Sequence, residues 1–533
     1  MATTLIVVVS LAAAACLWGL QRLLALHPST SPSALPPGPW RIPLLGNLNH
    51  FPPKNAPEWM FWREHLAPYG PVSSVTVLGQ TTIIFNDVDA AREILERKSS
   101  VTRFIPDSTM AKMSGWGPAL TTHRNLEVWK AVRLNMKREI GTRQLVSRLH
   151  PLMDRTIRRL LGNVLASPED VRDHLRRDVI GFMLSFGYGY TMAPPDPVTG
   201  EEDPFYNLTR QAVSHFGQVF APLRWVVNSV TSCVVQYLPP WFPGAEFVRK
   251  AIEFRQCITA ATVLPYQFVR ARMTRNDAAF QPSMLSRMLQ DGPPSPNSIH
   301  ETAMLWSTAE VYLGGAETNV SAMISFLIAA ALNPEVQRKA QQELDRVVGA
   351  PTLPGYQHRA QLPYITALVQ ETLRWRPPAP VAAPHVADAD LSWNGYSIPK
   401  GAYLLANIGA FTQNATVYKD PACFNPSRFL QSPPEPDPRK YVFGFGRRLC
   451  PGRFLAEERL FLFIARFLAC FDVAPRDPNA PAPRWLPGII THPEPFGLDI
   501  RPRSPAHAAL IRESAMEVAV GAHDAEDFAR LAV

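Results

Sequence analysis

The pattern of apolar and polar residues changes several times along the chain, and each change predicts a different element. Residues 5–20 carry no charge, and with the apolar residues 23–26 they form a stretch long enough to span a bilayer. Residues 72–77 and 81–85 are rich in β-branched side chains and are separated by Leu-Gly-Gln, which predicts a hairpin. A helical pattern follows over residues 88–97.

A long apolar run over residues 303–332 predicts a helix in the core, although Gly-Gly-Ala-Glu-Thr-Asn at 314–319 interrupts it. Two adjacent glycines inside a helix cost about 1–2 kcal/mol relative to alanine, so they need a packing or functional reason. Asn333 and Pro334 then predict a capped surface helix up to residue 348, with Asn333 as its cap and Pro334 as its first residue.

The segment 443–452, Phe-Gly-Phe-Gly-Arg-Arg-Leu-Cys-Pro-Gly, presents Cys450 as a candidate ligand. Cationic side chains and a helix N-terminus both stabilise a thiolate. Arg447 and Arg448 precede the cysteine, and Pro451 is expected to open a helix as its first residue. A lone Cys-Pro-Gly is more often a buried turn with an inert cysteine, so the assignment depends on the residues around it.

Those residues resemble the haem-binding loop of the cytochrome P-450 family at Phe443, Gly446, Arg448, Cys450, Gly452 and Ala456. The resemblance implies that Cys450 is the axial ligand of a haem b (iron protoporphyrin IX) and that the rest of the loop binds the cofactor. A thiolate on haem iron favours cleavage of the O–O bond. The implied fold is mainly α with small β-sheets, a cytochrome P-450 fold with an N-terminal transmembrane helix.

Further motifs of the family follow in its order. Trp129 and Arg133, four residues apart on one helical face, resemble a pair that reaches a haem propionate, and His385 stands where a second propionate donor is usual. Glu317 and Thr318 resemble the acid–alcohol pair that positions water and delivers protons at the distal face of the haem. Asn319 departs from the family's Thr or Ser, which puts the fine tuning of proton delivery in doubt.

Glu371 and Arg374 form a Glu-x-x-Arg element, and Arg428 supplies the arginine that the family adds to it. An acid and a base at this spacing usually make a trivial surface contact. The resemblance instead implies a buried ion network beneath the cysteine loop, with a structural role; breaking such a network costs about 3–5 kcal/mol.

Four stretches are assigned by family position to the substrate pocket, namely residues 101–120, 207–254, 377–384 and 488–493. The apolar side chains of the first two read equally well as ordinary core. Family position also makes 207–254 a lid and a second membrane contact, and 488–493 the tip of a hairpin that enters the pocket.

The chain of 533 residues, 46% hydrophobic and 18% charged, fits one large globular domain. We expect an N-terminal membrane anchor (1–26), a proline-rich hinge (27–47), a haem-thiolate catalytic domain (48–503) and an extension (504–533) that is a weak helix or a disordered tail. A cleaved signal peptide is the alternative for the anchor, but the segment lacks a basic start and the six cysteines form no close pairs. Positive charge follows the anchor, which predicts a single-pass protein with a cytosolic body. The proline-rich hinge resembles that of the microsomal members of the family, which implies the endoplasmic reticulum membrane.

A net charge of +8 without a dominant Lys/Arg block argues against nucleic acid as a partner. The expected activity is insertion of one oxygen atom from O2 into an apolar small molecule. Dinucleotide and flavin motifs are absent, so electrons must come from a separate NADPH-cytochrome reductase, with cytochrome b5 as a second donor. Two alternatives stay open: a haem-thiolate isomerase or ring-forming enzyme without net oxygen insertion, and a non-catalytic haem-binding membrane protein.

Overall fold

The computed structural model describes residues 34–531, apart from residues 44, 54–55, 121, 123–124, 222–223, 229–235, 276–279 and 520. The predicted anchor lies outside the described residues. Among them, one helix is long and apolar enough to cross a membrane, α14 (Ile299–Leu332), and 78% of its most apolar stretch is buried inside the protein. Helix α14 is therefore the central core helix of the globular body.

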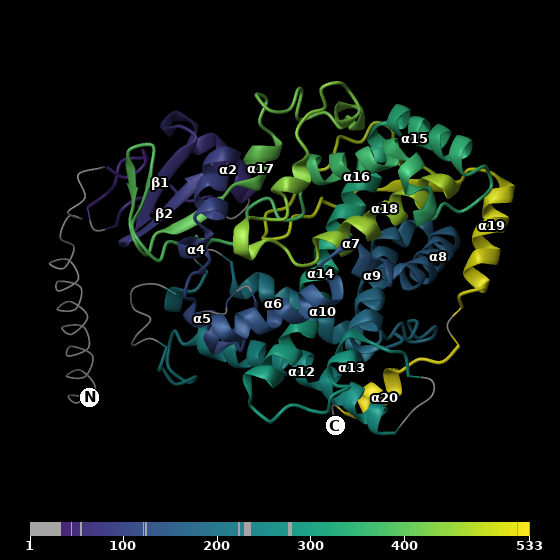
Figure 1. The fold of residues 1–533 in the computed structure, drawn as a ribbon, viewed down its shortest axis with the longest axis horizontal. Helices are drawn as coiled ribbons and strands as arrows, with labels where there is room; N and C mark the ends of the chain where they lie inside the picture. The colour runs from purple at the N-terminus through teal and green to yellow at the C-terminus, as the bar shows by residue number, and fades with distance from the viewer. Residues whose placement is uncertain are drawn as a thin grey trace.

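Helices make up most of the molecule, and a smaller β-rich part forms one end of it (Figure 1). The longer helices are α2 (Glu58–His65), α6 (Leu126–Ile140), α8 (His150–Ala166), α9 (Val171–Tyr188), α10 (Pro204–Val219), α12 (Glu246–Thr274), α14, α15 (Pro334–Val347), α16 (Pro363–Trp375), α18 (Arg453–Cys470) and α19 (Pro505–Met516). The shorter ones are α3 (Val88–Ala91), α4 (Ser99–Thr102), α5 (Thr109–Met113), α7 (Arg143–Ser147), α13 (Met284–Met288), α17 (Ile408–Thr412) and α20 (Ala525–Ala529). The predicted class, mainly α with small sheets, is confirmed.

Helix α14 continues through Gly314 and Gly315 without a break. The glycine pair therefore interrupts the apolar pattern of the sequence but not the backbone of the helix. A Cβ on Gly315 would lie 2.7 Å from the terminal methyl carbon of Met183 on α9. Close packing between the two helices therefore accounts for this glycine. A Cβ on Gly314 would meet nothing within 4 Å, and Gly314 is exposed although it lies in the middle of the core helix.

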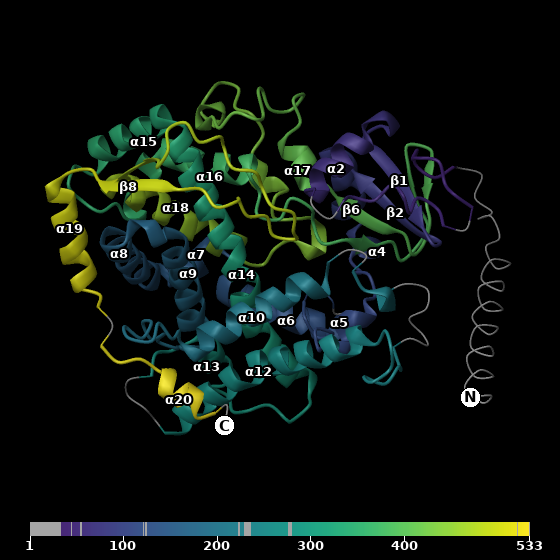
Figure 2. The same cartoon turned by 180° about the vertical axis from the view of Figure 1, so that it is seen from behind.

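The predicted hairpin is present as β1 (Val72–Val77) paired antiparallel with β2 (Gln80–Phe85). Two further strands complete this sheet in the order β1-β2-β6-β3, with β6 (Tyr403–Ala406) and β3 (His385–Val386) contributed from far along the chain (Figure 2). Two-stranded sheets are formed by β4 (Leu391–Trp393) with β5 (Tyr396–Ile398) and by β7 (Phe471–Pro475) with β8 (Leu498–Pro502).

The predicted helical stretch 88–97 is present with those bounds, as α3 followed by a π-helix, Arg92–Arg97. Two helix starts differ from the predictions. Asn333 does not cap α15, because its side-chain amide donates to the carbonyl of Ala329 one turn back in α14; Pro334 is the first helical residue as predicted. Pro451 does not open α18, which begins at Arg453 with Gly452 as its N-cap.

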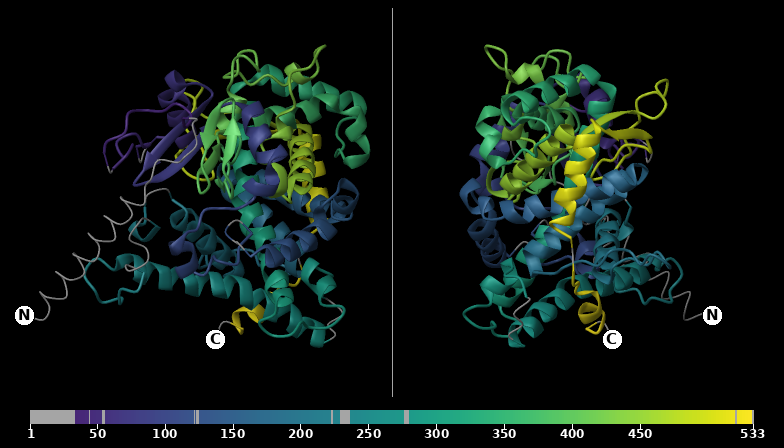
Figure 3. Two further views of the ribbon diagram at one scale, coloured as in Figure 1. Left: turned by 60° about the vertical axis from the view of Figure 1, so that its left-hand side comes forward. Right: turned by 90° about the vertical axis from the view of Figure 1, so that its right-hand side faces the viewer.

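The C-terminal extension is folded onto the body as two helices. Helix α19 packs along α8, and the right-hand view of Figure 3 shows it in yellow on the side that faces the viewer. The ring of Phe528 on α20 stacks on Phe205 with 4.5 Å between centroids. Asp524 accepts the N–H of Thr191 and pairs with Arg272, which fastens the end of the chain.

Candidate active site

The cysteine loop is a tight turn between η8 (Gly446–Arg448), a 3-10 turn, and α18. Gly446 has φ +53°, and a Cβ there would lie 2.4 Å from the carbonyl oxygen of Leu95. Only glycine satisfies both conditions. The amide of Cys450 donates to the carbonyl of Phe443 at 2.8 Å, and the half-buried Phe443 packs against the core.

Burial raises the pKa of the Cys450 thiol, whereas the N–H of Gly452 and the charges of Arg133 and Arg453 act to lower it. The cations that influence the sulfur are therefore not those predicted from the adjacent sequence. Arg447 is exposed, and the guanidinium of Arg448 donates to the backbone carbonyls of Arg103 and Leu120.

Arg448 belongs instead to a group of three cations, which we call the cation cluster: Arg133 and Arg448 lie over the ring of Trp129, and Arg103 lies close enough to Arg448 to lower its pKa. The Arg448 guanidinium lies 4.8 Å from the Trp129 ring centroid and donates to the carbonyls of Arg103 and Leu120, each at 2.6 Å. Arg133 donates to the carbonyl of Leu449 at 2.7 Å. Burial, with the charges of Arg133 and Arg103, lowers the pKa of Arg448 to about 10.

The cation cluster has the chemistry of an anion site. Among the described residues, neither Arg103 nor Arg133 forms an ion pair with a carboxylate. Trp129 Nε1 and Arg103 Nε are buried and have no hydrogen-bond partner in the described part of the chain. Buried donors without acceptors are rare unless a ligand or water completes them. The residues therefore fit a group with carboxylates, as a haem has; Arg103 was missed because it lies in an aperiodic stretch without a motif.

His385 is buried on β3, and its Nδ1 lies 2.7 Å from the carbonyl oxygen of Thr102. Since a carbonyl only accepts, Nδ1 carries a proton, and Nε2 carries none while the ring is neutral. Burial and the charge of Arg448 lower the pKa of His385 to about 4, opposed by the bond to Thr102. His385 can donate to a carboxylate only as imidazolium, a restriction that the sequence did not reveal.

Thr318 lies on the same stripe of α14 as Gly314, one turn further on. Its hydroxyl donates to the Gly314 carbonyl at 2.8 Å, and the two residues are not covered by the helices packed against α14. Asn319, the departure from the family pattern, is buried and donates to the Gly315 carbonyl at 2.7 Å. The gap at Gly314 leaves room for a flat group against this face of α14.

The carboxylate of Glu317 is held from two sides. Arg176 on α9 donates to Oε1 at 2.9 Å, and His492 Nε2 lies 3.2 Å from Oε2. Burial by itself would raise the pKa of Glu317, but the hydrogen bond from His492 and the charge of Arg176 lower it to about 2. Glu317 is therefore ionised near neutral pH and serves as a hydrogen-bond acceptor.

Neither partner of Glu317 was predicted for this role. His492 lies in the 488–493 loop, which is tied down by Thr491: its amide donates to Pro378 at 2.9 Å and its carbonyl accepts from the Ser321 hydroxyl at 2.6 Å. The loop thus contacts α14. The sequence shows His492 in this loop, but it does not show that His492 meets Glu317.

Glu371, Arg374 and Arg428 meet in a buried network, as the family resemblance implied. Arg374 makes a bidentate pair with Glu371 at 2.7 and 2.8 Å, and Arg428 reaches the same carboxylate at 3.2 Å. A further acid, Glu435, pairs with Arg428 at 2.6 Å. Two carboxylates therefore balance two guanidinium groups, and backbone carbonyls such as those of Thr412 and Cys423 occupy the remaining N–H donors.

Three aromatic residues of the predicted pocket-lining stretches, Trp116, Phe216 and Phe220, form an aromatic wall with a fourth residue, Trp306, that lies outside those stretches. The Trp116 ring lies 5.2 Å from Phe216, 6.3 Å from Phe220 and 6.1 Å from Trp306 between centroids. Trp306 belongs to α14, two turns before Gly314, and Phe216 to α10. The wall thus stands at the N-terminal side of the Gly314 gap.

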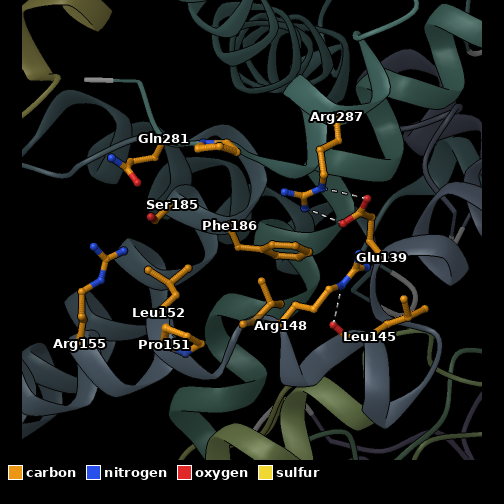
Figure 4. A pocket seen from close by; sticks show the side chains of 12 residues that line it. Glu139, Leu145, Arg148, Pro151, Leu152, Arg155, Ser185, Phe186, Gln281 and Arg287 are labelled. Carbon is orange, nitrogen blue, oxygen red and sulfur yellow. Dashed lines mark hydrogen bonds and ion pairs between the residues drawn. The ribbon is translucent and has the colours of Figure 1, made fainter. Parts of the chain in front are cut away.

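A separate surface pocket of about 400 Å³ lies between α8, α9 and the end of α6 (Figure 4). Arg287 pairs with Glu139 on one side of it, and the exposed Arg155 borders the other. None of the predicted site residues lines this pocket. It is a charged groove outside the cysteine site.

Comparisons with known proteins agree with this geometry. Residues 36–500 match the family model described as Cytochrome P-450. The chain is 48% identical over 517 residues to O-methylsterigmatocystin oxidoreductase of Aspergillus flavus, covering 96% of each chain. It is 38% identical to cytochrome P-450 monooxygenase ppsD of Aspergillus oryzae, with 94% of each chain covered.

Solved structures share the fold. A zebra fish cytochrome P-450 with abiraterone aligns with 84% of this chain and 100% of its own at a TM-score of 0.66 and 23% identity. A second zebra fish structure, with progesterone, gives a TM-score of 0.67 at 22% identity. With the family model spanning most of the chain and relatives that are fungal monooxygenases of secondary metabolism, this chain belongs to the cytochrome P-450 family and is a haem-thiolate monooxygenase.

Proposed function

We propose that this chain is a membrane-anchored monooxygenase with haem b that inserts one oxygen atom into an aromatic small molecule. The observation that carries the proposal is the Cys450 loop beside the cation cluster, where buried N–H donors lack acceptors. The aromatic wall favours a flat, ring-containing substrate, because stacked and edge-on ring contacts add to the burial of apolar area. The O-methylsterigmatocystin oxidoreductase at 48% identity supports a substrate of that kind.

When bound, the haem supplies the activation of O2 and the transfer of one oxygen atom. In this proposal Cys450 ligates the iron, and Phe443, Gly446 and Gly452 shape the loop that presents the sulfur. The carboxylates of the cofactor are held by Trp129, Arg103, Arg133, Arg448 and, when protonated, His385.

Thr318 and Glu317 would position water at the uncovered face of α14. The Thr318 hydroxyl donates to Gly314, which leaves its oxygen as an acceptor for a water at that face. The carboxylate of Glu317, held ionised between Arg176 and His492, would orient water beside Thr318 as a hydrogen-bond acceptor.

Electrons come from a redox partner, for which we propose NADPH-cytochrome reductase, with cytochrome b5 as a second donor. We further propose that residues 1–26 anchor the protein in the endoplasmic reticulum membrane with the body in the cytosol. The uncharged N-terminal stretch and the positive charges that follow it support this orientation.

The test is a pair of measurements on protein expressed beside a microsomal reductase. The reduced protein with CO should show the band typical of thiolate ligation, and Cys450→His should retain haem without that band. Mass spectrometry of products from O-methylsterigmatocystin and related aromatic compounds should find a gain of one oxygen atom. A histidine-type band in the unmodified protein would overturn the assignment of Cys450.

A further inference from the structure

Glu310 on α14 has no part in the reaction or the networks described above. It stands one turn before Gly314 and two turns before Thr318, so the three residues share one stripe of the helix. Trp306 of the aromatic wall stands one turn before Glu310 on the same stripe. Glu310 is therefore an acid placed between the aromatic wall and the uncovered face of α14.

One carboxyl oxygen of Glu310 is occupied and the other is not. Oε1 accepts the amide N–H of Leu120 at 2.7 Å, and the described residues offer Oε2 no hydrogen bond or ion pair. The carbonyl of the same Leu120 accepts from Arg448 at 2.6 Å. The loop that ends at Leu120 is thus fastened on one side to α14 and on the other to the cation cluster.

A second polar group in the same wall lacks a partner. The indole N–H of Trp116, a side chain that is 2% exposed, has no acceptor among the described residues, although its ring contacts Trp306 and Phe216. A wall made of aromatic rings with one unpaired donor and one half-occupied carboxyl matches a molecule that combines flat rings with oxygen acceptors.

Burial raises the pKa of Glu310 to about 7, and the Leu120 amide opposes this only in part. Charged groups on the surrounding elements are engaged elsewhere: Arg133 with Leu449, Arg176 with Glu317, Arg255 with Met113 and Lys112, His215 with Glu253, and Arg448 with the carbonyls of Leu120 and Arg103. The carboxyl is therefore protonated below neutral pH and can then donate a hydrogen bond.

We propose that Glu310 determines substrate specificity: its carboxyl, oriented by Leu120, donates a hydrogen bond to a carbonyl or ether oxygen of an aromatic substrate that lies against Trp116 and Trp306. This inference rests on the proposed function and adds to it the requirement for an oxygen acceptor on the rings. Glu310 would thus select oxygenated aromatic molecules over hydrocarbons of the same shape.

The test compares two probes that differ only in one group, 9-fluorenone with a carbonyl and fluorene with a methylene. Binding to the haem-loaded protein is followed by the change in its absorbance spectrum during titration. At pH 6 the unmodified protein should bind 9-fluorenone about tenfold more tightly than fluorene, and this preference should vanish by pH 8.5 as Glu310 ionises. E310L should remove the preference at both pH values and leave fluorene binding unchanged.

E310Q is the matched variant, because its amide keeps the size, the acceptor for Leu120 and one donor. It should retain the preference and lose its pH dependence. The inference is overturned if E310L keeps the preference, if the unmodified protein shows none, or if E310L weakens both probes equally. Turnover does not enter this measurement, so a protein with the expected preference that forms no oxygenated product overturns the proposed function and not the role of Glu310.

Discussion

Two groups of arginines near the cysteine loop differ in how their charge is balanced. Arg374 and Arg428 meet the carboxylates of Glu371 and Glu435, and backbone carbonyls take up most of their remaining donors. In the cation cluster, Arg133 donates to the carbonyl oxygen of Leu449. The nearby indole N–H of Trp129 has no hydrogen-bond acceptor among the described residues. The first group carries its own counter-charges, whereas in the described part of the chain Arg103 and Arg133 meet no carboxylate.

The difference distinguishes arginines that stabilise the fold from arginines that are available to bind a ligand. A buried guanidinium must be paired, because removing it from water without an opposite charge costs several kcal/mol. Where the chain supplies that charge itself, as Glu371 does, the network holds the fold. Where it does not, the missing charge must come from a ligand. The uncovered stripe at Gly314 and Thr318 lacks covering side chains and not a charge, and it too leaves room for a ligand.

The largest expected effect is on the buried network of Glu371, Arg374 and Arg428. Arg374→Ala leaves Glu371 with one cation fewer in a fully buried site, so we expect a loss of about 3–5 kcal/mol and little haem-loaded protein. Soluble yield and melting temperature measure it. The control is Arg447→Ala, an exposed arginine in the cysteine loop, which should change stability by less than about 0.5 kcal/mol. A normal melting temperature for Arg374→Ala would contradict the structural role.

Thr318→Val tests the uncovered stripe of α14 at Gly314 and Thr318. Its hydroxyl is proposed to hold the water that delivers protons, so the ratio of product to NADPH oxidised should fall by about 10²-fold while haem content stays constant. Thr308→Val is the matched control, because Thr308 makes the same backbone bond in the same helix, at 3.0 Å, but is fully buried. Equal effects of both substitutions would assign Thr318 to packing alone.

Arg133→Leu tests the cation cluster. The loss of one charge should weaken retention of the haem about tenfold, with little change in the stability of the haem-free protein. Transfer of haem to excess apomyoglobin measures the retention. Lys130→Leu, an exposed cation on the same helix, should leave it unchanged. A large loss of stability in haem-free Arg133→Leu would mean that the cluster supports the fold after all.

Glu317→Gln tests whether the ion pair between Glu317 and Arg176 contributes to the stability of the protein. Its pKa of about 2 lies below the ordinary value, so its ionised form stabilises the protein above about pH 4.5, and this contribution is lost as the pH falls toward 2. Between pH 6 and pH 3 the melting temperature should therefore fall further in the unmodified protein than in Glu317→Gln, by about 2 °C. Parallel decreases would show that the pair with Arg176 adds no stability.

The sequence by itself determined the features that depend on short spacing. Three or four residues between partners place Glu371 beside Arg374 and Trp129 beside Arg133, because helix geometry alone brings such positions to one face. The hairpin β1-β2 followed from β-branched runs around Leu78-Gly79, where the backbone turns with positive φ at both residues. The central helix followed from its length and apolar composition.

Only the tertiary structure decided which distant groups meet. Glu317 receives Arg176 from α9 and His492 from a C-terminal loop, and these partners, far apart in the sequence, turn a predicted acid into an ionised carboxylate. Arg448 likewise meets the carbonyl of Leu120, 328 residues away along the chain. Such contacts depend on how helices and loops pack, and spacing along the chain carries no record of them.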